Sequence, residues 1–224
     1  MKACYDGGIN FFDNAEGYGS GDAEELMGAA IAMGIDRQYW TREDLVITTK
    51  IFNGTPARWA EGAMTMNRSG LSRKHLYEGL KASLERFNLE YIDCVFCHSV
   101  DPVTPIEEVV RAFNILIDKG LCFYWGTSTW TARMIEEACA VADRLGLQGP
   151  VMEQPKYNLL SREIVEKEYA ELYPRIGLTV FSPLAGGILT GKYTGGVIPA
   201  GSRQVRWCCS TSDSAARIFA LHHH

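Results

Sequence analysis

Short apolar runs alternate with longer segments of mixed polarity along most of the chain. The runs are apolar at consecutive positions, as are the strands of a parallel sheet that is covered on both faces. Six of them predict β-strands, at 8–13, 45–50, 92–98, 122–126, 151–154 and 178–181.

The segments between these runs predict helices. Leu76, Leu80 and Leu84 recur at helical spacing, and Ser72 is suited to cap the helix that contains them. Helices are expected at 23–33, 73–87, 104–118, 131–145 and 161–172, with Asp22 as N-cap of the first. Repeated alternation of strand and helix predicts an α/β fold with a parallel sheet.

Periodicity alone does not decide between an open sheet and a barrel. A doubly wound sheet would carry a glycine-rich turn such as G-x-G-x-x-G after its first strand, and the chain has none there. Polar residues at the ends of several strands favour a (β/α)8 barrel, because chemistry in that fold is found at the carboxyl ends of the strands.

Four polar residues end or follow the first three predicted strands: Asp13, Tyr18, Lys50 and His98. A carboxylate, a phenol, an ammonium and an imidazole at one edge suit proton transfer to a carbonyl oxygen. An ammonium beside a phenol stabilises the phenolate and makes the phenol a stronger acid. We expect Asp13 to keep Lys50 charged and in place, and His98 to donate or relay a hydrogen bond to the substrate oxygen.

Composition excludes several classes of function. The 224 residues are 46% hydrophobic and 22% charged, as in an ordinary globular protein, and the net charge of −5 argues against a nucleic-acid partner. No run approaches about 18 apolar residues, so no membrane span is expected. Seven scattered cysteines and the lack of a secretory signal pattern predict a reducing, cytoplasmic location, without a disulfide framework or a metal site.

Two short motifs match the patterns of a nucleotide-binding loop and of a cysteine pair, but their surroundings do not support either site. The segment 186–192 matches G-x-x-x-x-G-K, but Tyr193 follows where a nucleotide-binding P-loop needs Ser or Thr. Its backbone N–H groups and Lys192 can still meet phosphates. Cys94 and Cys97 lie in a predicted strand, where side chains three positions apart point to opposite faces, so a redox or metal pair is not expected.

A long ordered series of segments carries a family resemblance between Ala3 and Arg203. The segments are 8–19, 47–50, 71–75, 79–86, 91–93, 101–108, 124–128 and 182–187. With them the chain resembles the aldo-keto reductases, and within these the group related to the beta subunits of voltage-gated potassium channels. The resemblance implies a partial reductase barrel over 1–203, followed by an unassigned tail over 204–224 whose three final histidines are typical of a purification tag.

The resemblance implies a (β/α)8 barrel that binds NADPH and reduces aldehydes and ketones, with the catalytic tetrad Asp13, Tyr18, Lys50 and His98. It also implies a set of cofactor-binding residues: Ser128 and Gln154 at the carboxamide, Phe181 stacked on the nicotinamide, Ser182, Pro183, Leu184, Ala185 and Gly187 at the pyrophosphate, and Lys192 and Arg203 at the adenosine phosphates.

Three functions follow as alternatives. The first is an NADPH-dependent reductase of small carbonyl compounds, which His98 favours. The second is a regulatory subunit of a potassium channel, assembled as a homotetramer, in which the cofactor site acts as a sensor. The third is an inactive fragment, because the family's first and last barrel strands have no counterpart in this chain and six strands of eight cannot close the usual barrel.

Overall fold

The computed structural model describes residues 1–55, 66–173, 175–193 and 198–202. It divides into two compact units. Unit 1 comprises Met1–Gln154 and Glu168–Thr179, and unit 2 comprises Pro155–Lys167 and the chain from Val180 onward. Arg203 and the predicted tail 204–224 lie outside the described residues, so the boundary at residue 203 stays a prediction.

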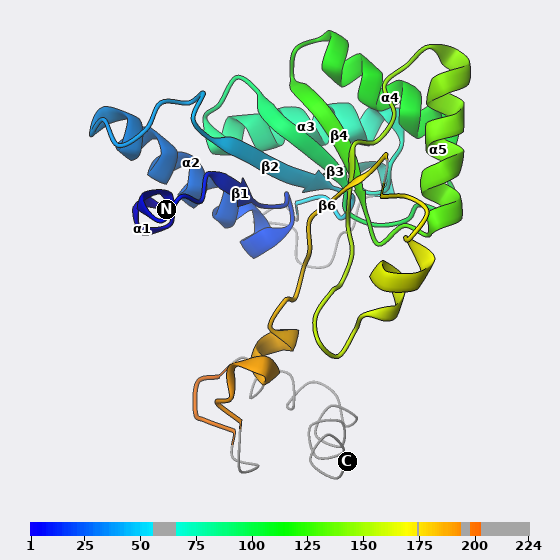
Figure 1. Ribbon diagram of the computed structural model, residues 1–224. Coiled ribbons are helices and arrows are strands. Elements are labelled where there is room, and N and C mark those ends of the chain that lie inside the picture. The colour runs from blue at the N-terminus through cyan, green and yellow to red at the C-terminus, as the bar shows by residue number, and fades with distance from the viewer. Residues whose placement is uncertain (56–65, 174, 194–197, 203–224) are drawn as a thin grey trace. The chain divides into compact units, whose positions relative to one another are not determined.

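Unit 1 contains one parallel sheet whose strands follow one another in sequence order (Figure 1). The strands are β1 (Phe11–Asp13), β2 (Val46–Ile51), β3 (Ile92–Cys97), β4 (Cys122–Ser128), β5 (Met152–Gln154) and β6 (Gly177–Leu178). Consecutive order without reversal is the order of a (β/α)8 barrel, whereas a doubly wound sheet reverses direction at a switch point. The prediction of an incomplete barrel with six strands is therefore confirmed.

Helices connect the strands much as the sequence predicts. They are α1 (Lys2–Asp6), α2 (Asp22–Asp36), α3 (Arg73–Phe87), α4 (Ile106–Asp118) and α5 (Ala132–Leu145), with short 3-10 turns η1 (Tyr18–Gly21) and η2 (Met66–Arg68). The Ser72 hydroxyl accepts a 3.2 Å hydrogen bond from His75 N, so the predicted cap of α3 is confirmed. The N-cap of α2 is Gly21 rather than Asp22, because the backbone enters the helix at φ 98°.

The predicted helix at 161–172 is wrong. The segment contains a single π-helical turn, η3 (Ile164–Glu168), followed by tight turns. The apolar spacing that suggested a helix does reflect burial, because Val165, Tyr169 and Leu172 are all buried. The chain passes from unit 2 to unit 1 between Lys167 and Glu168, at the end of this π-helical turn, and the segment does not form the regular α-helix that was predicted.

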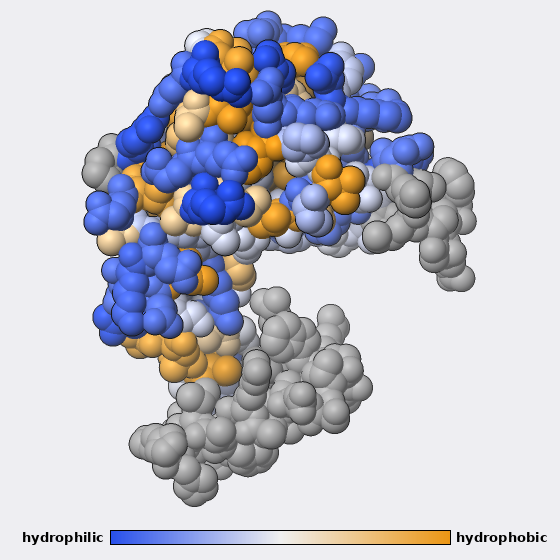
Figure 2. Space-filling view, turned by 90° about the vertical axis from the view of Figure 1, so that its right-hand side faces the viewer, coloured by the Kyte–Doolittle hydropathy of each residue, from blue (hydrophilic) through white to orange (hydrophobic). Residues whose placement is uncertain are grey.

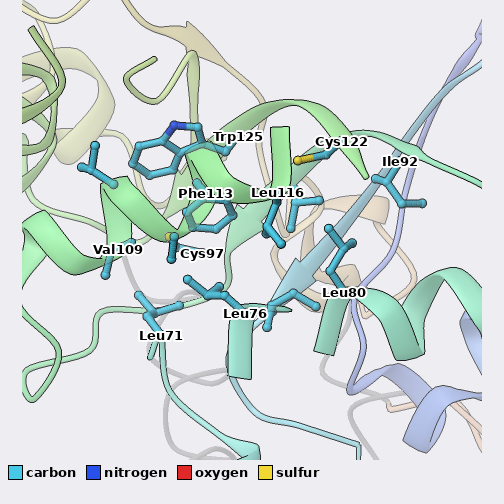
Figure 3. Packing of buried hydrophobic residues seen from close by; sticks show 14 of the residues in the cluster. Leu71, Leu76, Leu80, Ile92, Cys97, Val109, Phe113, Leu116, Cys122 and Trp125 are labelled. Carbon is cyan, nitrogen blue, oxygen red and sulfur yellow. The ribbon is translucent and has the colours of Figure 1, made fainter. Parts of the chain in front are cut away.

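The core of unit 1 lies between the sheet and its helices. Side chains alternate across a strand, so Ile47 and Ile51 of β2 and Val95 and Cys97 of β3 share one face with Trp125 of β4. Figure 3 shows part of this core, with Cys97 and Trp125 of the sheet beside Phe113 of α4. The rings of Phe113 and Trp125 stack with centroids 4.7 Å apart. The buried leucines of α3 belong to the same cluster: Leu76, Leu80 and Leu84.

The strand register places the predicted site on the opposite face of the sheet. Asp13 pairs with Thr48, and Lys50, two residues further along β2, pairs with Phe96. Phe96 in turn pairs with Gly126, where a Cβ atom would lie 2.8 Å from the Phe96 ring and 2.7 Å from a backbone oxygen. Only glycine leaves room for the aromatic ring to cover β4 at this level.

Unit 2 is held together by backbone and side-chain hydrogen bonds. Phe181 N donates to Pro155 O over 3.0 Å, and Phe181 forms a parallel bridge with Lys156. The Asn158 amide donates to the Ser182 carbonyl over 3.0 Å. The unit also contains η4 (Ala185–Thr190). The last predicted strand, 178–181, is therefore split: β6 belongs to unit 1 and Phe181 to unit 2.

The surface of unit 1 is polar on the face that carries α5, where apolar residues appear only as separate patches (Figure 2). Within the described part of the chain, the helices are too short or too polar to cross a bilayer.

Candidate active site

A buried ion pair lies at the carboxyl ends of β1 and β2. The Lys50 ammonium contacts Asp13 Oδ2 and donates a 2.8 Å hydrogen bond to the Asn14 carbonyl. The Thr48 hydroxyl donates to the other carboxylate oxygen of Asp13 over 2.6 Å. The Lys50 side chain is 1% exposed and that of Asp13 is 28% exposed, so the carboxylate is the part of the pair that solvent reaches.

Tyr18 lies beside this pair, in η1 directly after β1. Its ring centroid is 5.0 Å from Lys50 Nζ and 5.6 Å from the centroid of the His98 ring, which stands at 80° to it. Gly19, Ser20 and Gly21 follow with positive φ angles, and this tight turn leads the chain from Tyr18 into α2. Tyr18 is 42% exposed, so solvent reaches the site at this residue.

His98 comes from the loop after β3, where its backbone N–H donates to Ile51 O over 3.1 Å. Burial lowers the pKa of the imidazole from its ordinary value, and the nearby Lys50 charge lowers it further, against the opposing charges of Asp13 and Glu16. The ring is therefore neutral at pH 7. Its Nδ1 atom is buried and has no hydrogen-bond partner among the described residues.

Two of the predicted cofactor residues reach the same edge. The Gln154 side-chain amide at the end of β5 donates to Asp13 Oδ2 and to Thr179 Oγ1, each over 3.3 Å. The Ser128 hydroxyl at the end of β4 donates to the Gln154 carbonyl over 2.7 Å. The structure thus brings Asp13, Tyr18, Lys50, His98, Ser128 and Gln154 together within unit 1.

The other predicted cofactor residues, except Arg203, lie in unit 2. Ser182, Ala185 and Gly187 have positive φ angles, which turn the backbone sharply around η4. A Cβ atom on Gly187 would lie 2.8 Å from Lys192 Cε and 3.0 Å from Nζ, so the ammonium lies against bare backbone. A cation over a glycine turn suits an anion such as a phosphate. Phe181, Pro183 and Leu184 belong to the same unit.

The donor chemistry of each unit, taken by itself, fits one part of a nicotinamide dinucleotide. The Gln154 amide of unit 1 suits a carboxamide, and the Lys192 ammonium of unit 2 suits a phosphate.

The sequence prediction missed three residues that support the ion pair and its loop. The Asn14 carbonyl and the Thr48 hydroxyl hold Lys50 and Asp13. The buried Glu16 carboxylate accepts hydrogen bonds from the backbone of Phe52 and Gly54, at 2.7 and 2.8 Å. The period of two along β2 places Thr48 on the face of Lys50, and that signal could have identified it.

Comparison with known proteins supplies the family. The sequence model described as the aldo/keto reductase family matches residues 1–220. The chain belongs to the aldo/keto reductase family. The family that the resemblance implies is therefore confirmed.

Curated relatives of this aldo/keto reductase chain are named as channel subunits. It is 54% identical over 205 residues to a "Probable voltage-gated potassium channel subunit beta" of Arabidopsis thaliana, and 53% identical over 206 residues to a protein of the same name from Oryza sativa subsp. japonica. It is 49% identical over 205 residues to a "Putative voltage-gated potassium channel subunit beta" of Schizosaccharomyces pombe. Each match covers 91% of the chain but only 56–59% of the relative.

Proposed function

We propose that this chain acts as an NADPH-dependent oxidoreductase that reduces aldehydes and ketones to alcohols. The observation that carries the proposal is the buried Asp13–Lys50 ion pair, with Tyr18 and His98 beside it at one edge of the sheet. This arrangement provides a proton donor with a fixed positive charge next to it.

Each of these four side chains has one role in the proposed mechanism. NADPH supplies the hydride when it is bound. The exposed Tyr18 hydroxyl donates its proton to the carbonyl oxygen, and the Lys50 ammonium stabilises the phenolate that remains. Asp13 keeps the ammonium in place, and the neutral imidazole of His98 donates or relays a hydrogen bond that orients the substrate oxygen.

The cofactor contacts are proposed residue by residue. Ser128 and Gln154 hold the carboxamide and Phe181 stacks on the nicotinamide. The pyrophosphate is assigned to Ser182, Pro183, Leu184, Ala185 and Gly187. Lys192 and Arg203 bind the adenosine phosphates, and the preference for NADPH over NADH depends on these two cations because the extra phosphate is anionic.

The direct test is turnover. The chain is incubated with NADPH and 4-nitrobenzaldehyde, and both the oxidation of NADPH and the alcohol product are measured. The proposal predicts one alcohol for each NADPH consumed. NADPH loss without alcohol, or no reaction with any aldehyde or ketone of a broad panel, would contradict it.

The curated relatives favour a second function, because the proteins from Arabidopsis thaliana, Oryza sativa and Schizosaccharomyces pombe are all named as channel beta subunits. A regulatory subunit, with the same site acting as a cofactor sensor, would assemble as a homotetramer and bind a potassium channel in the cytoplasm. It predicts co-purification with a channel domain, unchanged in Tyr18→Phe. If neither the wild-type protein nor Tyr18→Phe co-purifies with the channel domain, the regulatory function is contradicted.

The fragment alternative is tested by thermal melting with and without NADPH. A ligand that binds only the folded state raises the melting temperature by mass action. Both cofactor-dependent functions predict a rise with NADPH. A broad transition that NADPH does not move would instead favour an inactive fragment.

A further inference from the structure

A buried carboxylate lies directly behind the candidate site. Glu153 precedes Gln154 in β5 and pairs in register with Thr127 of β4. Because side chains alternate along a strand, Glu153 points away from the face that carries Gln154 and toward the core. The residue is 1% exposed. An acid buried on the apolar side of a sheet is costly, so its retention calls for a physical explanation.

The carboxylate has few hydrogen-bond partners. Its Oε1 lies 3.4 Å from the Tyr169 hydroxyl, which has a single proton and also contacts the Trp130 carbonyl, while Oε2 and the Thr127 hydroxyl both lack a partner of good geometry among the described residues. Thr127 and the backbone N–H groups of Thr129 and Trp130 still lie close enough to favour the charged form. The titratable groups that face Glu153 are the Tyr169 phenol and the Cys97 thiol of β3, both neutral at pH 7.

Burial outweighs these favourable contacts and raises the pKa of Glu153 to about 7. The charged and neutral forms of the carboxyl are therefore both populated near neutral pH. The charged form attracts the N–H groups of Thr129 and Trp130. The neutral form attracts them less and becomes a donor, and the Thr127 hydroxyl, in register on β4, can accept from it.

The N–H groups near Glu153 belong to a loop that adjoins the candidate site. Thr129 has φ 61°, a left-handed conformation that a β-branched residue adopts only when its surroundings hold it. Ser128 precedes it, with its hydroxyl on the Gln154 carbonyl. Trp130 follows, with its carbonyl accepting from the Tyr169 hydroxyl.

Trp130 also connects this loop to the loop of His98. Its indole Nε1–H donates a 3.2 Å hydrogen bond to the carbonyl of Ser99, the residue after His98. Trp130 is almost fully buried, so it moves as part of the packed layer. The chain thus joins the Thr129–Trp130 backbone to Ser128, and the indole hydrogen bond joins it to the loop of His98.

We propose that Glu153 is a positioning residue: the charge on its carboxylate holds the Ser128–Trp130 loop and, through Trp130, sets the positions of Ser128 and His98. The expected effect of Glu153 on turnover rests on the proposed function. The expected movement of the loop is independent of that function, because it needs neither cofactor nor substrate.

The test follows the indole N–H resonance of Trp130 by NMR between about pH 5 and 9, with the resonance assigned from Trp130→Phe. The proposal predicts a single titration step with its midpoint near pH 7. Trp40 is the internal control, because it is buried and its indole donates a similar 3.2 Å hydrogen bond to Ile31 O, away from Glu153. Its resonance should stay constant.

Two variants separate Glu153 from His98 as the titrating group. Glu153→Gln should abolish the Trp130 step, while a step that survives in this variant overturns the proposal. Tyr169→Phe removes a hydrogen bond that lowers the pKa of Glu153, so its midpoint should move to higher pH. This second variant keeps the proposal testable if Glu153→Gln does not fold, and an unmoved midpoint overturns it.

The pH profile of carbonyl reduction provides the functional readout. The proposal predicts a kcat step near pH 7 in the wild-type protein that is missing in Glu153→Gln. If the protein does not turn over while Trp130 titrates as described, the proposed function fails and the positioning role stands. If turnover is normal and Trp130 does not titrate, the positioning role fails alone.

Discussion

The Lys50 ammonium contacts the Asp13 carboxylate across neighbouring strands, and the lysine side chain is 1% exposed. The strand register explains the contact, because Asp13 pairs with Thr48 and Lys50 follows Thr48 on the same face. The positive charge is therefore fixed in a place that water hardly reaches, next to the phenol of Tyr18. A charge held in this way stabilises a developing anion without reorganising during the reaction.

Asp13→Asn tests whether the buried ammonium depends on its partner. Removal of one member of a buried ion pair leaves an uncompensated charge, which costs about 3–5 kcal/mol. We expect the free energy of unfolding to fall by about 3 kcal/mol, near the lower end of this range, because the Asp13 side chain is 28% exposed. Urea unfolding followed by circular dichroism measures the change.

The matched control for Asp13→Asn is the double variant Asp13→Asn/Lys50→Met. Methionine removes the buried charge and keeps much of the side-chain volume, so the double variant should recover most of the lost stability. Equal losses in the single and double variants would show that packing, and not charge, accounts for the effect.

His98 makes the stability of the protein depend on pH. Its pKa is lowered by burial and by Lys50, so the folded protein binds the proton less readily than the unfolded chain does. Its contribution to stability is thus present above the unfolded pKa of about 6.5 and is lost as pH falls through the lower, folded value. Between about pH 7.5 and 5, wild-type protein should lose more unfolding free energy than His98→Gln. Parallel curves for the two proteins contradict this expectation.

Glu153 makes stability depend on pH in the opposite direction to His98. Burial raises its pKa from 4.5 to about 7, so its contribution to stability is full below about 4.5 and is lost as pH rises through 7. Ionisation at pH 8 costs roughly 3 kcal/mol by this difference. Glu153→Gln should therefore gain stability relative to wild type between about pH 4.5 and 8, as measured by urea unfolding. A constant difference between the two proteins would mean that the carboxyl is not so deeply buried in solution.

Gly126 is required by the packing of Phe96. In Gly126→Ala the new methyl group would lie within 3 Å of the Phe96 ring and of the Met152 carbonyl. We therefore expect the free energy of unfolding to fall by about 1–3 kcal/mol. Gly149→Ala is the control, because its Cβ atom would meet neighbours only at 3.5 Å or more. If the two variants melt at the same temperature, the close packing over β4 is not present in solution.

Much of this arrangement could be predicted from local pattern. The strand ends at Asp13 and Lys50 follow from apolar runs, and Ser72 is a cap that needs only its own sequence neighbourhood. The helix at 161–172 was wrongly predicted, because helical spacing of buried residues does not reveal where a chain leaves one packed unit for another. The period of two along β2 places Thr48 on the face of Lys50, but the pairing of Thr48 with Asp13 and of Glu153 with Thr127 depends on register between strands, which a single sequence does not specify.

The central claim is that the Tyr18 hydroxyl is the proton donor, and kcat for NADPH-dependent reduction of 4-nitrobenzaldehyde by Tyr18→Phe tests it most directly. General acid catalysis contributes about 100-fold to 10,000-fold, so kcat should fall by at least about 100-fold. Tyr39→Phe should retain wild-type activity, because Tyr39 precedes β2 at the opposite edge of the sheet, where its ring faces Lys2. A kcat for Tyr18→Phe within a few-fold of that for Tyr39→Phe would contradict the account.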